Sequence, residues 1–306
     1  MEMKRVEGGV CAARGFVANG LNCGLNPDKE KHDLALIYSE TPCQAAAVYT
    51  TNKVKGAPIL VTKSNLTKSG NIARAVIANS KNANTGNADG EEKAYRMCEL
   101  AAQELGIQPE EVIVASTGVI GLPLPIEPIE NSIHALAQGL SAEHHGDAAY
   151  AIMTTDTVRK EVAVQYEVGG CVCTVGGMAK GSGMIHPNMA TMLVFVTTYC
   201  AISPAILQKA LGEDVKASLL FLRFFCFFVI RVYHDILDFV IGNKARGVEK
   251  NCQCNQEGKC DPERGEKGED NKIEIKNDQH SEKRKEISSK AEDGENQRIL
   301  EQLEKR

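Results

Sequence analysis

Short runs of alternating apolar and polar residues, the pattern of half-buried β-strands, recur through the first two hundred residues of the chain. Gly, Pro, Asn and Asp residues separate these runs, as is typical of the turns between strands. We predict a hairpin of residues 161–166 and 171–175 around Gly169 and Gly170, and an apolar strand that begins with residues 193–196. Further strands are predicted at residues 33–38, 45–50, 59–61, 73–78 and 112–115.

Three segments carry the apolar spacing of amphipathic helices instead. In residues 90–106 the apolar side chains fall on one helical face, and Gly106 is a natural C-terminal stop. Residues 129–140 repeat this pattern, and residues 204–211 place Pro204 at the first helical position, where its missing N–H group is not needed. Because strands alternate with helices, we predict a layered fold of the α/β (α+β) class.

The composition of the chain changes after residue 217. Residues 1–217 read as one folded domain, whereas residues 218–248 hold six of the eight phenylalanines of the protein. Four charged residues interrupt the most apolar part of this second segment, residues 219–241, which is therefore too broken for a membrane-spanning helix (Arg223, Arg231, Asp235 and Asp238). Residues 249–306 are rich in charge and poor in large apolar side chains, which predicts a disordered tail.

Charge and cysteine content narrow the classes of partner. The 306-residue chain has a net charge of −5, and its basic residues do not cluster, so no nucleic-acid partner is expected. Its eleven cysteines are scattered and odd in number, and no secretory leader opens the chain, which together predict free thiols and a cytoplasmic location. No metal site is predicted, because the histidines lack metal-ligand spacing and the group of Cys252, Cys254 and Cys260 lacks a fourth ligand.

A glycine-rich loop at residues 176–183 leads toward the bond between Ala190 and Thr191, just before the predicted strand at residue 193. A threonine hydroxyl is a weak nucleophile that needs an adjacent base. Cleavage of the Ala190–Thr191 bond would free the α-amine of Thr191, which titrates at about 7.7–8.0 and supplies such a base. The loop does not match a phosphate-binding pattern, because Lys180 precedes Gly181 instead of following a glycine.

A second candidate feature is the turn of Ser116, Thr117 and Gly118 at the end of a predicted strand. Such a turn can direct a backbone N–H group and a hydroxyl at one point, as an oxyanion hole requires. Most turns of this composition have no catalytic role, so assigning an oxyanion hole to this turn depends on which residues lie beside it.

Taken together, these segments resemble the ornithine acetyltransferase family, the glutamate N-acetyltransferase and amino-acid acetyltransferase of arginine biosynthesis. The resemblance covers residues 8–217, and its most specific block is 187–193, which contains Thr191. In the asparagine loop that begins at Asn79, Lys81 stands where the family usually has glycine. The matching segments, in family order, are residues 15–16, 22–24, 33–37, 49–58, 79–80 with 82–84, 116–121, 153–157, 180–185 and 187–193.

The resemblance implies a layered sheet-and-helix fold of the N-terminal-nucleophile aminopeptidase type and a multifunctional, autocatalytically cleaved enzyme. Thr191 would cut its own bond to Ala190, accept an acetyl group from N-acetylornithine and pass it to glutamate, with Thr117 and Gly118 as the oxyanion hole. Thr154 and Lys180 would bind substrate, and Thr155 is an alternative to Thr154. No resident cofactor is implied, and acetyl-CoA is an alternative acetyl donor.

The resemblance also implies that the two cleaved chains stay associated, although the family's heterotetramer is not expected here. The second half of the family sequence is missing after residue 217, which raises the alternative of a truncated, catalytically inactive fragment. A further alternative is an N-terminal-nucleophile amidase or aminopeptidase on a similar fold. The block around Thr191 favours acetyl transfer over hydrolysis.

Overall fold

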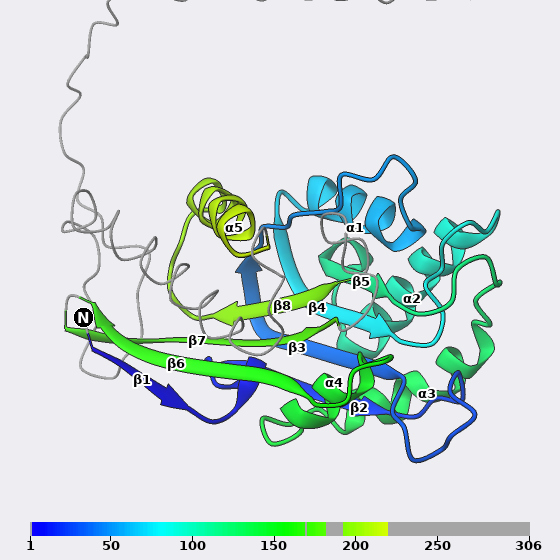
Figure 1. The fold of residues 1–306 in the computed structure, drawn as a ribbon, viewed down its shortest axis with the longest axis horizontal. Coiled ribbons are helices and arrows are strands. Elements are labelled where there is room, and N and C mark those ends of the chain that lie inside the picture. Colours follow the sequence, from blue (N-terminus) through cyan, green and yellow to red (C-terminus); the bar gives the residue numbers. More distant parts are fainter. Residues whose placement is uncertain (1, 169, 182–191, 220–306) are drawn as a thin grey trace, which may run out of the picture. The chain divides into compact units, whose positions relative to one another are not determined.

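The computed structural model describes residues 2–168, 170–181 and 192–219, which all belong to one compact unit, Met1–Gly258. Helices and two four-stranded sheets make up this part of the chain (Figure 1), which confirms the predicted mixed α/β class. Two short 3₁₀ helices, Gly9–Cys11 and Pro109–Glu111, connect some of these elements. Residues 220–306, with most of the phenylalanine-rich segment and the charged tail, lie outside the described residues, as do Ala190 and Thr191.

The first sheet has the strand order β2-β3-β4-β5. Its strands are β2 (Phe16–Leu21), β3 (Leu34–Gln44), β4 (Ile72–Asn79) and β5 (Val112–Ser116). Strands β4 and β5 are parallel, and the other neighbours are antiparallel. Parallel neighbours require a crossover connection, which helix α2 (Gly90–Leu105) provides.

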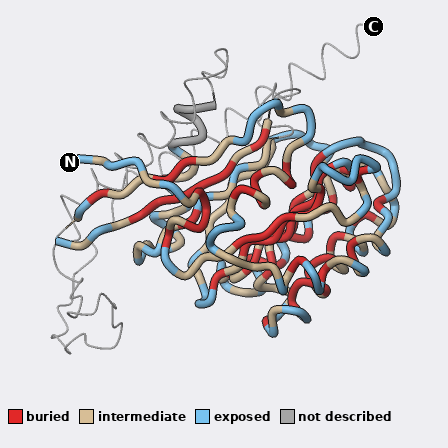
Figure 2. The backbone as a smooth tube through the Cα atoms, turned by 90° about the horizontal axis from the view of Figure 1, so that it is seen from below, coloured by how far each residue is buried: buried red, intermediate tan, exposed pale blue. Residues whose placement is uncertain are grey.

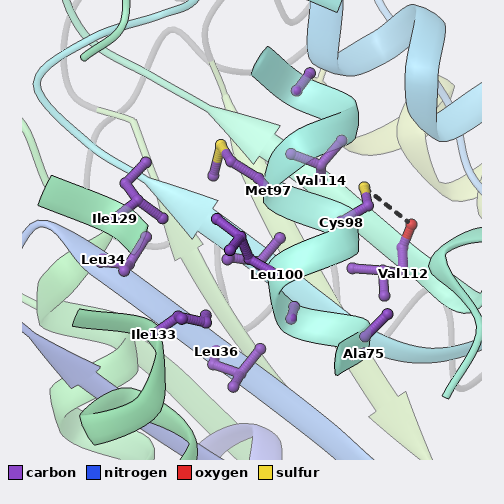
Figure 3. Packing of buried hydrophobic residues seen from close by; sticks show 14 of the residues in the cluster. Leu34, Leu36, Ala75, Met97, Cys98, Leu100, Val112, Val114, Ile129 and Ile133 are labelled. Atoms are coloured by element: carbon purple, nitrogen blue, oxygen red, sulfur yellow. Dashed lines mark hydrogen bonds between the residues drawn. The ribbon is translucent and has the colours of Figure 1, made fainter. Parts of the chain in front are cut away.

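Helices cover one face of this sheet and bury the largest hydrophobic cluster (Figure 3). Leu34 and Leu36 of β3 meet Met97 of α2 and Ile129 of α3 (Glu127–Gln138) there. The apolar face predicted for residues 90–106 is the buried one, and Gly106 ends α2 in the left-handed conformation at φ 65°. The periodicity of this helix was therefore a sufficient guide to its packing.

The second sheet is antiparallel, with the order β1-β6-β7-β8. Its strands are β1 (Met3–Val6), β6 (Lys160–Val168), β7 (Cys171–Lys180) and β8 (Leu193–Thr198), which confirms the predicted hairpin. Ala35 and Ile37 of β3 share a second buried cluster with Met178 of β7 and with α4 (His145–Ala151). Both faces of β3 are thus covered, and Figure 2 shows buried residues running along the central strands.

The strand predicted at residues 59–61 is wrong, because these residues lie in helix α1 (Ala57–Lys68). Pro58 occupies the first turn of α1, where proline is well tolerated. The buried face then includes Thr62 and Asn65, whose side chains donate hydrogen bonds to the carbonyl groups of Val114 at 2.8 Å and Val112 at 3.0 Å. Because these two inward-facing residues are polar, the positions of the apolar residues alone do not show the helical period of α1.

The strand predicted at residues 45–50 is also wrong, because the chain has no regular structure there. Strand β3 pairs with β4 as far as Gln44 and Ile72, and the Ala45 N–H group then donates to the Asn71 carbonyl at 2.8 Å. Since β4 begins at Ile72, no further partner strand is available, and an apolar stretch cannot form a strand without one.

The remaining elements extend the predictions. Helix α5 (Pro204–Leu219) contains the predicted helix at residues 204–211, whereas β1, β2 and α4 were not predicted. Strand β1 carries charged residues, and β2 contains Asn19 and Gly20, so neither shows a clear strand pattern. None of the described helices is long and apolar enough to cross a membrane.

Candidate active site

The amine of Lys180 is the centre of the candidate site. Lys180 is the last residue of β7 and is only 4% exposed. Its Nζ atom donates hydrogen bonds to Thr117 Oγ1 at 3.0 Å and to Thr154 Oγ1 at 2.7 Å. The structure thereby brings Lys180 together with two residues that lie 26 and 63 positions before it in the sequence. Thr154, one of the two alternative threonines, thus contacts this amine through its hydroxyl.

Burial lowers the pKa of Lys180 below its ordinary value, and the nearby positive charge of Lys160 acts in the same direction. The negative charge of Asp156 opposes both effects. Within the described residues, two of the three N–H groups of the Lys180 ammonium have acceptors. A partly desolvated ammonium with a remaining donor favours an anionic ligand, such as the carboxylate of an amino acid.

The carboxylate of Asp156 fixes the backbone on two sides of Lys180. Its side chain is fully buried, and Oδ1 accepts hydrogen bonds from the Gly181 N–H group at 3.0 Å and from Lys160 Nζ at 2.5 Å. Oδ2 accepts a longer one from the Thr154 N–H group at 3.4 Å. Although burial alone would raise the pKa of Asp156, the hydrogen bond from Lys160 and the backbone donors hold it below its ordinary value.

Asp156 is not among the site residues predicted above, although residues 153–157 belong to the segments that carry the family resemblance. A lone aspartate in a threonine-rich segment is common on protein surfaces, so composition offers no warning. The available signal was Lys160, four positions further along the chain, but that spacing indicates an ion pair only where the segment is helical.

The turn at Thr117 and Gly118 has little freedom. Thr117 is 4% exposed, and its N–H group donates to the Asn79 carbonyl at 3.0 Å. Its Oγ1 accepts from Lys180, so its own hydroxyl hydrogen remains for another acceptor. Gly118 has φ 137°, and a Cβ atom at this position would overlap the backbone carbonyl of Lys81. The turn therefore requires glycine.

Buried asparagines hold the neighbouring loop against this turn. Asn79 Nδ2 donates to the Asn82 carbonyl at 2.9 Å, and Asn82 Nδ2 donates to the Leu122 carbonyl at 3.0 Å. Asn84 Nδ2 donates to the Gly90 carbonyl at 2.8 Å. The sequence predicted a loop from these residues but not their structural role, which is to satisfy backbone groups that burial removes from water.

Lys81 in this loop has φ 72°, in the left-handed region. That conformation costs a residue with a Cβ atom roughly 1–2 kcal/mol. Glycine at this position would relieve the strain, but its greater freedom in the unfolded chain offsets roughly 0.5–1 kcal/mol of that relief. We therefore expect Lys81→Gly to raise the free energy of unfolding, measured with urea, by roughly 0.5–1 kcal/mol. Lys81→Ala removes the same charge but keeps the Cβ atom, so an equal gain in Lys81→Ala would contradict the explanation by strain.

The nucleophile predicted from the sequence, Thr191, and the residue before it, Ala190, lie outside the described residues. The two ends of that segment are described. Lys180 of β7 and Leu193 of β8 are directly paired across the sheet. The chain thus leaves β7 and re-enters β8 at the same end of the sheet, beside the Lys180 amine.

Two further observations limit the chemistry of the described part. Among residues 2–168, 170–181 and 192–219, no group of three or more His, Cys, Asp or Glu side chains is placed to hold a metal ion. Two surface hollows lie elsewhere: one is lined by residues that include Lys68 and Glu111, and the other by residues that include Tyr95 and Glu130. Neither hollow includes Lys180.

Comparison with known proteins gives consistent results. The family model described as the ArgJ family matches residues 17–222. The chain is 52% identical over 218 residues to the arginine biosynthesis bifunctional protein ArgJ of Symbiobacterium thermophilum, a match that covers 71% of this chain and 54% of that protein. It is 49% identical over 218 residues to the protein of the same name from Bacillus subtilis, again with 71% of this chain and 52% of that protein covered. The chain thus spans about half the length of the curated relatives it matches.

Two solved structures share the fold. The crystal structure of arginine biosynthesis bifunctional protein ArgJ from Bacillus halodurans matches with a TM-score of 0.57 and 42% identity, over 62% of this chain and 98% of that chain. Ornithine acetyltransferase from Mycobacterium tuberculosis, solved in complex with ornithine, matches with a TM-score of 0.56 and 35% identity, over 63% of this chain and 100% of that chain.

Proposed function

Because the chain belongs to the ArgJ family, we propose that it is an acyltransferase that moves an acetyl group from N-acetylornithine to glutamate through an acyl-enzyme on Thr191. The relatives are named as proteins of arginine biosynthesis, and one is an ornithine acetyltransferase solved with ornithine, which favours acetyl transfer over the hydrolase alternative. Because the chain spans only about half the length of these relatives, an inactive fragment is the alternative that experiment must exclude.

The observation that carries the proposal is the position of Lys180 opposite Leu193. Directly opposed residues of antiparallel strands have Cα atoms about 4.5–5.5 Å apart. Thr191 precedes Leu193 by two residues, which span at most about 7 Å of extended chain. This short connection limits how far Thr191 can lie from Leu193, and the proposal places its hydroxyl close to the amine that also contacts Thr117 and Thr154.

The first step is cleavage. The Thr191 hydroxyl attacks the carbonyl carbon of Ala190, and its proton passes to the departing nitrogen as the peptide C–N bond breaks. Water then hydrolyses the resulting ester, which leaves Thr191 with a free α-amine and a free hydroxyl. Thr117 and Gly118 stabilise the negative charge that develops on the carbonyl oxygen. Lys180 supports this role, because its hydrogen bond to Thr117 Oγ1 leaves the hydroxyl hydrogen for the oxyanion.

The second step is transfer. The free α-amine of Thr191 takes the hydroxyl proton while the oxygen attacks the acetyl carbonyl of N-acetylornithine, and ornithine leaves with that proton. Glutamate then attacks the acetyl ester through its amine and leaves as N-acetylglutamate. Lys180 and Thr154 bind the carboxylate of whichever amino acid is present. No resident cofactor is needed, and acetyl-CoA is a second donor to test because the relatives are named bifunctional.

The pairing of β7 with β8 explains how two cleaved chains would stay together. The ladder runs from Lys180–Leu193 to Val175–Thr198, so it joins residues on both sides of the Ala190–Thr191 bond. Less than two thirds of this chain covers 98% or more of each solved chain, so the solved chains are about half as long as the curated sequences. A cut near the Ala190–Thr191 bond would produce chains of about this length. The cytoplasmic location stays a prediction.

The test of the proposed function is to sequence the N-terminus of every fragment of the purified protein and to measure N-acetylglutamate formed from N-acetylornithine and glutamate. We expect a fragment that begins at Thr191 and product formation that requires both substrates. Release of acetate without glutamate would favour the hydrolase. An uncut chain without product would show an inactive fragment.

A separate prediction concerns the charge of Lys180. Lys180→Gln keeps a hydrogen-bond donor but removes the charge, so we expect kcat/KM to fall roughly tenfold or more, as is typical for loss of a charged hydrogen bond. In the unmodified protein, the charged form is lost as the pH rises through a pKa that lies below the ordinary value for lysine, so activity should fall in alkali earlier than a normal lysine would allow. Lys63→Gln, in helix α1, is the matched control and should leave both the rate and its pH profile unchanged.

A further inference from the structure

One cysteine on β7 and another just past the end of β8 pack against a small third cluster of buried residues in the second sheet. Cys173 belongs to β7, and Cys200 follows the end of β8. The β7–β8 ladder ends with Val175 opposite Thr198. Strand pairing stops there, but the same antiparallel register continued by two residues would bring Cys173 opposite Cys200. Opposed residues have Cα atoms about 4.5–5.5 Å apart, inside the range of about 4.4–6.8 Å that a disulfide spans.

Tyr166 shows that the two thiols point to the same place. Tyr166 of β6 is the cross-strand partner of Cys173, and its hydroxyl lies 3.6 Å from Cys200 Sγ. Strands β6, β7 and β8 lie side by side in the sheet (Figure 1). Burial raises the pKa of Tyr166, and so do Cys200 and Cys173, each through its charge and a hydrogen bond. One phenol oxygen is thus within hydrogen-bonding reach of both sulfur atoms.

Three of the other described cysteines differ from this pair. Cys11 and Cys98 are buried, and burial raises the pKa of each thiol to about 12, as it does for Cys23. Such thiols carry little of the thiolate that attacks disulfides. Cys173 and Cys200 are half-buried and pack against Tyr166 and its neighbours, so a small reagent can reach them.

We propose that Cys173 and Cys200 form a dithiol site for exchange with a low-molecular-weight disulfide. The thiolate of one cysteine attacks the small disulfide, forms a mixed disulfide and releases one small thiol. The second cysteine then displaces the other small thiol, which closes the Cys173–Cys200 bond. The two protein thiols are oxidised, the small disulfide is reduced to two thiols, and two protons pass to those thiols.

The Cys173–Cys200 disulfide would span the predicted cleavage point of the chain. The Ala190–Thr191 bond lies between Cys173 and Cys200 in the sequence. If the chain is cleaved there, as the proposed function requires, the disulfide joins the two products covalently across β7 and β8. Oxidation would then convert a pair held by strand pairing into one that denaturants do not separate.

The test uses the full chain with Ser in place of the cysteines after residue 219 (Cys226, Cys252, Cys254 and Cys260). The protein is incubated with glutathione disulfide, alkylated and digested with trypsin, and the peptides are identified by mass spectrometry. We expect peptide 161–180 linked to a peptide that ends at Lys209, with the loss of two hydrogens. The linked peptide forms whether or not the chain is cleaved, so failure of cleavage and failure of the dithiol site are separate results.

Two variants assign the sulfur atoms, because peptide 161–180 holds both Cys171 and Cys173. Cys173→Ser should remove the linked peptide, whereas Cys171→Ser should leave its yield unchanged. In the cleaved protein, the two fragments should migrate together in denaturing gels until a reductant is added. Glutathione attached singly to each cysteine, or a link that survives in Cys173→Ser, would overturn the proposal.

Discussion

Thr191→Ala is expected to yield a single uncut chain that forms no N-acetylglutamate. The substitution removes the oxygen that attacks the Ala190 carbonyl, and no other group on the proposed path can replace it. Both cleavage and transfer depend on this oxygen, so the two losses should occur together. Fragment masses and the acetyl-transfer rate from N-acetylornithine to glutamate measure them separately.

Thr191→Ser is the matched control for this variant. Serine keeps the hydroxyl and its place next to the α-amine but lacks the methyl group, so cleavage and transfer should continue at reduced rates. If Thr191→Ala were still cut at the same bond, another nucleophile would have to be responsible. If Thr191→Ser behaved like Thr191→Ala, the methyl group rather than the hydroxyl would be the essential feature.

Asp156→Asn is expected to have the second largest effect, although this side chain is not proposed to touch substrate. The buried carboxylate accepts hydrogen bonds from Gly181 and Lys160, and an amide replaces a charged acceptor by a neutral one. Charge-assisted bonds contribute about 1.5–3 kcal/mol each, so we expect the free energy of unfolding to fall by roughly 2 kcal/mol. Asp28→Asn, at an exposed pair with Lys31, should change it by less than about 0.5 kcal/mol.

The pH dependence of this variant separates a positioning role from a merely structural one. Because the pKa of Asp156 is lowered in the folded protein, its stabilisation is present above the unfolded value of about 3.9 and is lost as the pH falls through the folded value. Asp156→Asn should lack this acid-dependent loss. Asp156 also raises the pKa of Lys180, so its removal should move the alkaline fall in activity to lower pH. An unchanged alkaline limb would contradict the coupling between Asp156 and Lys180.

Local patterns in the sequence predicted the elements that pack against the rest of the protein through one apolar face. Helix α2 and the β6–β7 hairpin are of this kind, and both were found as expected. Helix α1 was mistaken for a strand because Thr62 and Asn65 pack inward through hydrogen bonds to β5. Residues 45–50 carry a strand pattern but have no strand to pair with, a fact that depends on where β4 begins.

The candidate site was predictable only through the family resemblance. Thr117, Thr154 and Lys180 come from three separate segments, and no spacing rule joins residues that lie 63 positions apart. What the structure adds is the hydrogen bonding that holds them: the carboxylate of Asp156, the buried asparagines beside Gly118 and the pairing of Lys180 with Leu193. Each of these depends on tertiary contacts that a single segment does not reveal.

The most direct test of the proposed function is the mass of the fragment that contains Thr191, measured before and after the purified protein is mixed with N-acetylornithine alone. The proposed mechanism predicts a fragment that begins at Thr191, gains one acetyl group on that residue and loses it when glutamate is added. An uncut chain, or a cut fragment that never carries an acetyl group, would contradict an acyl-enzyme on Thr191.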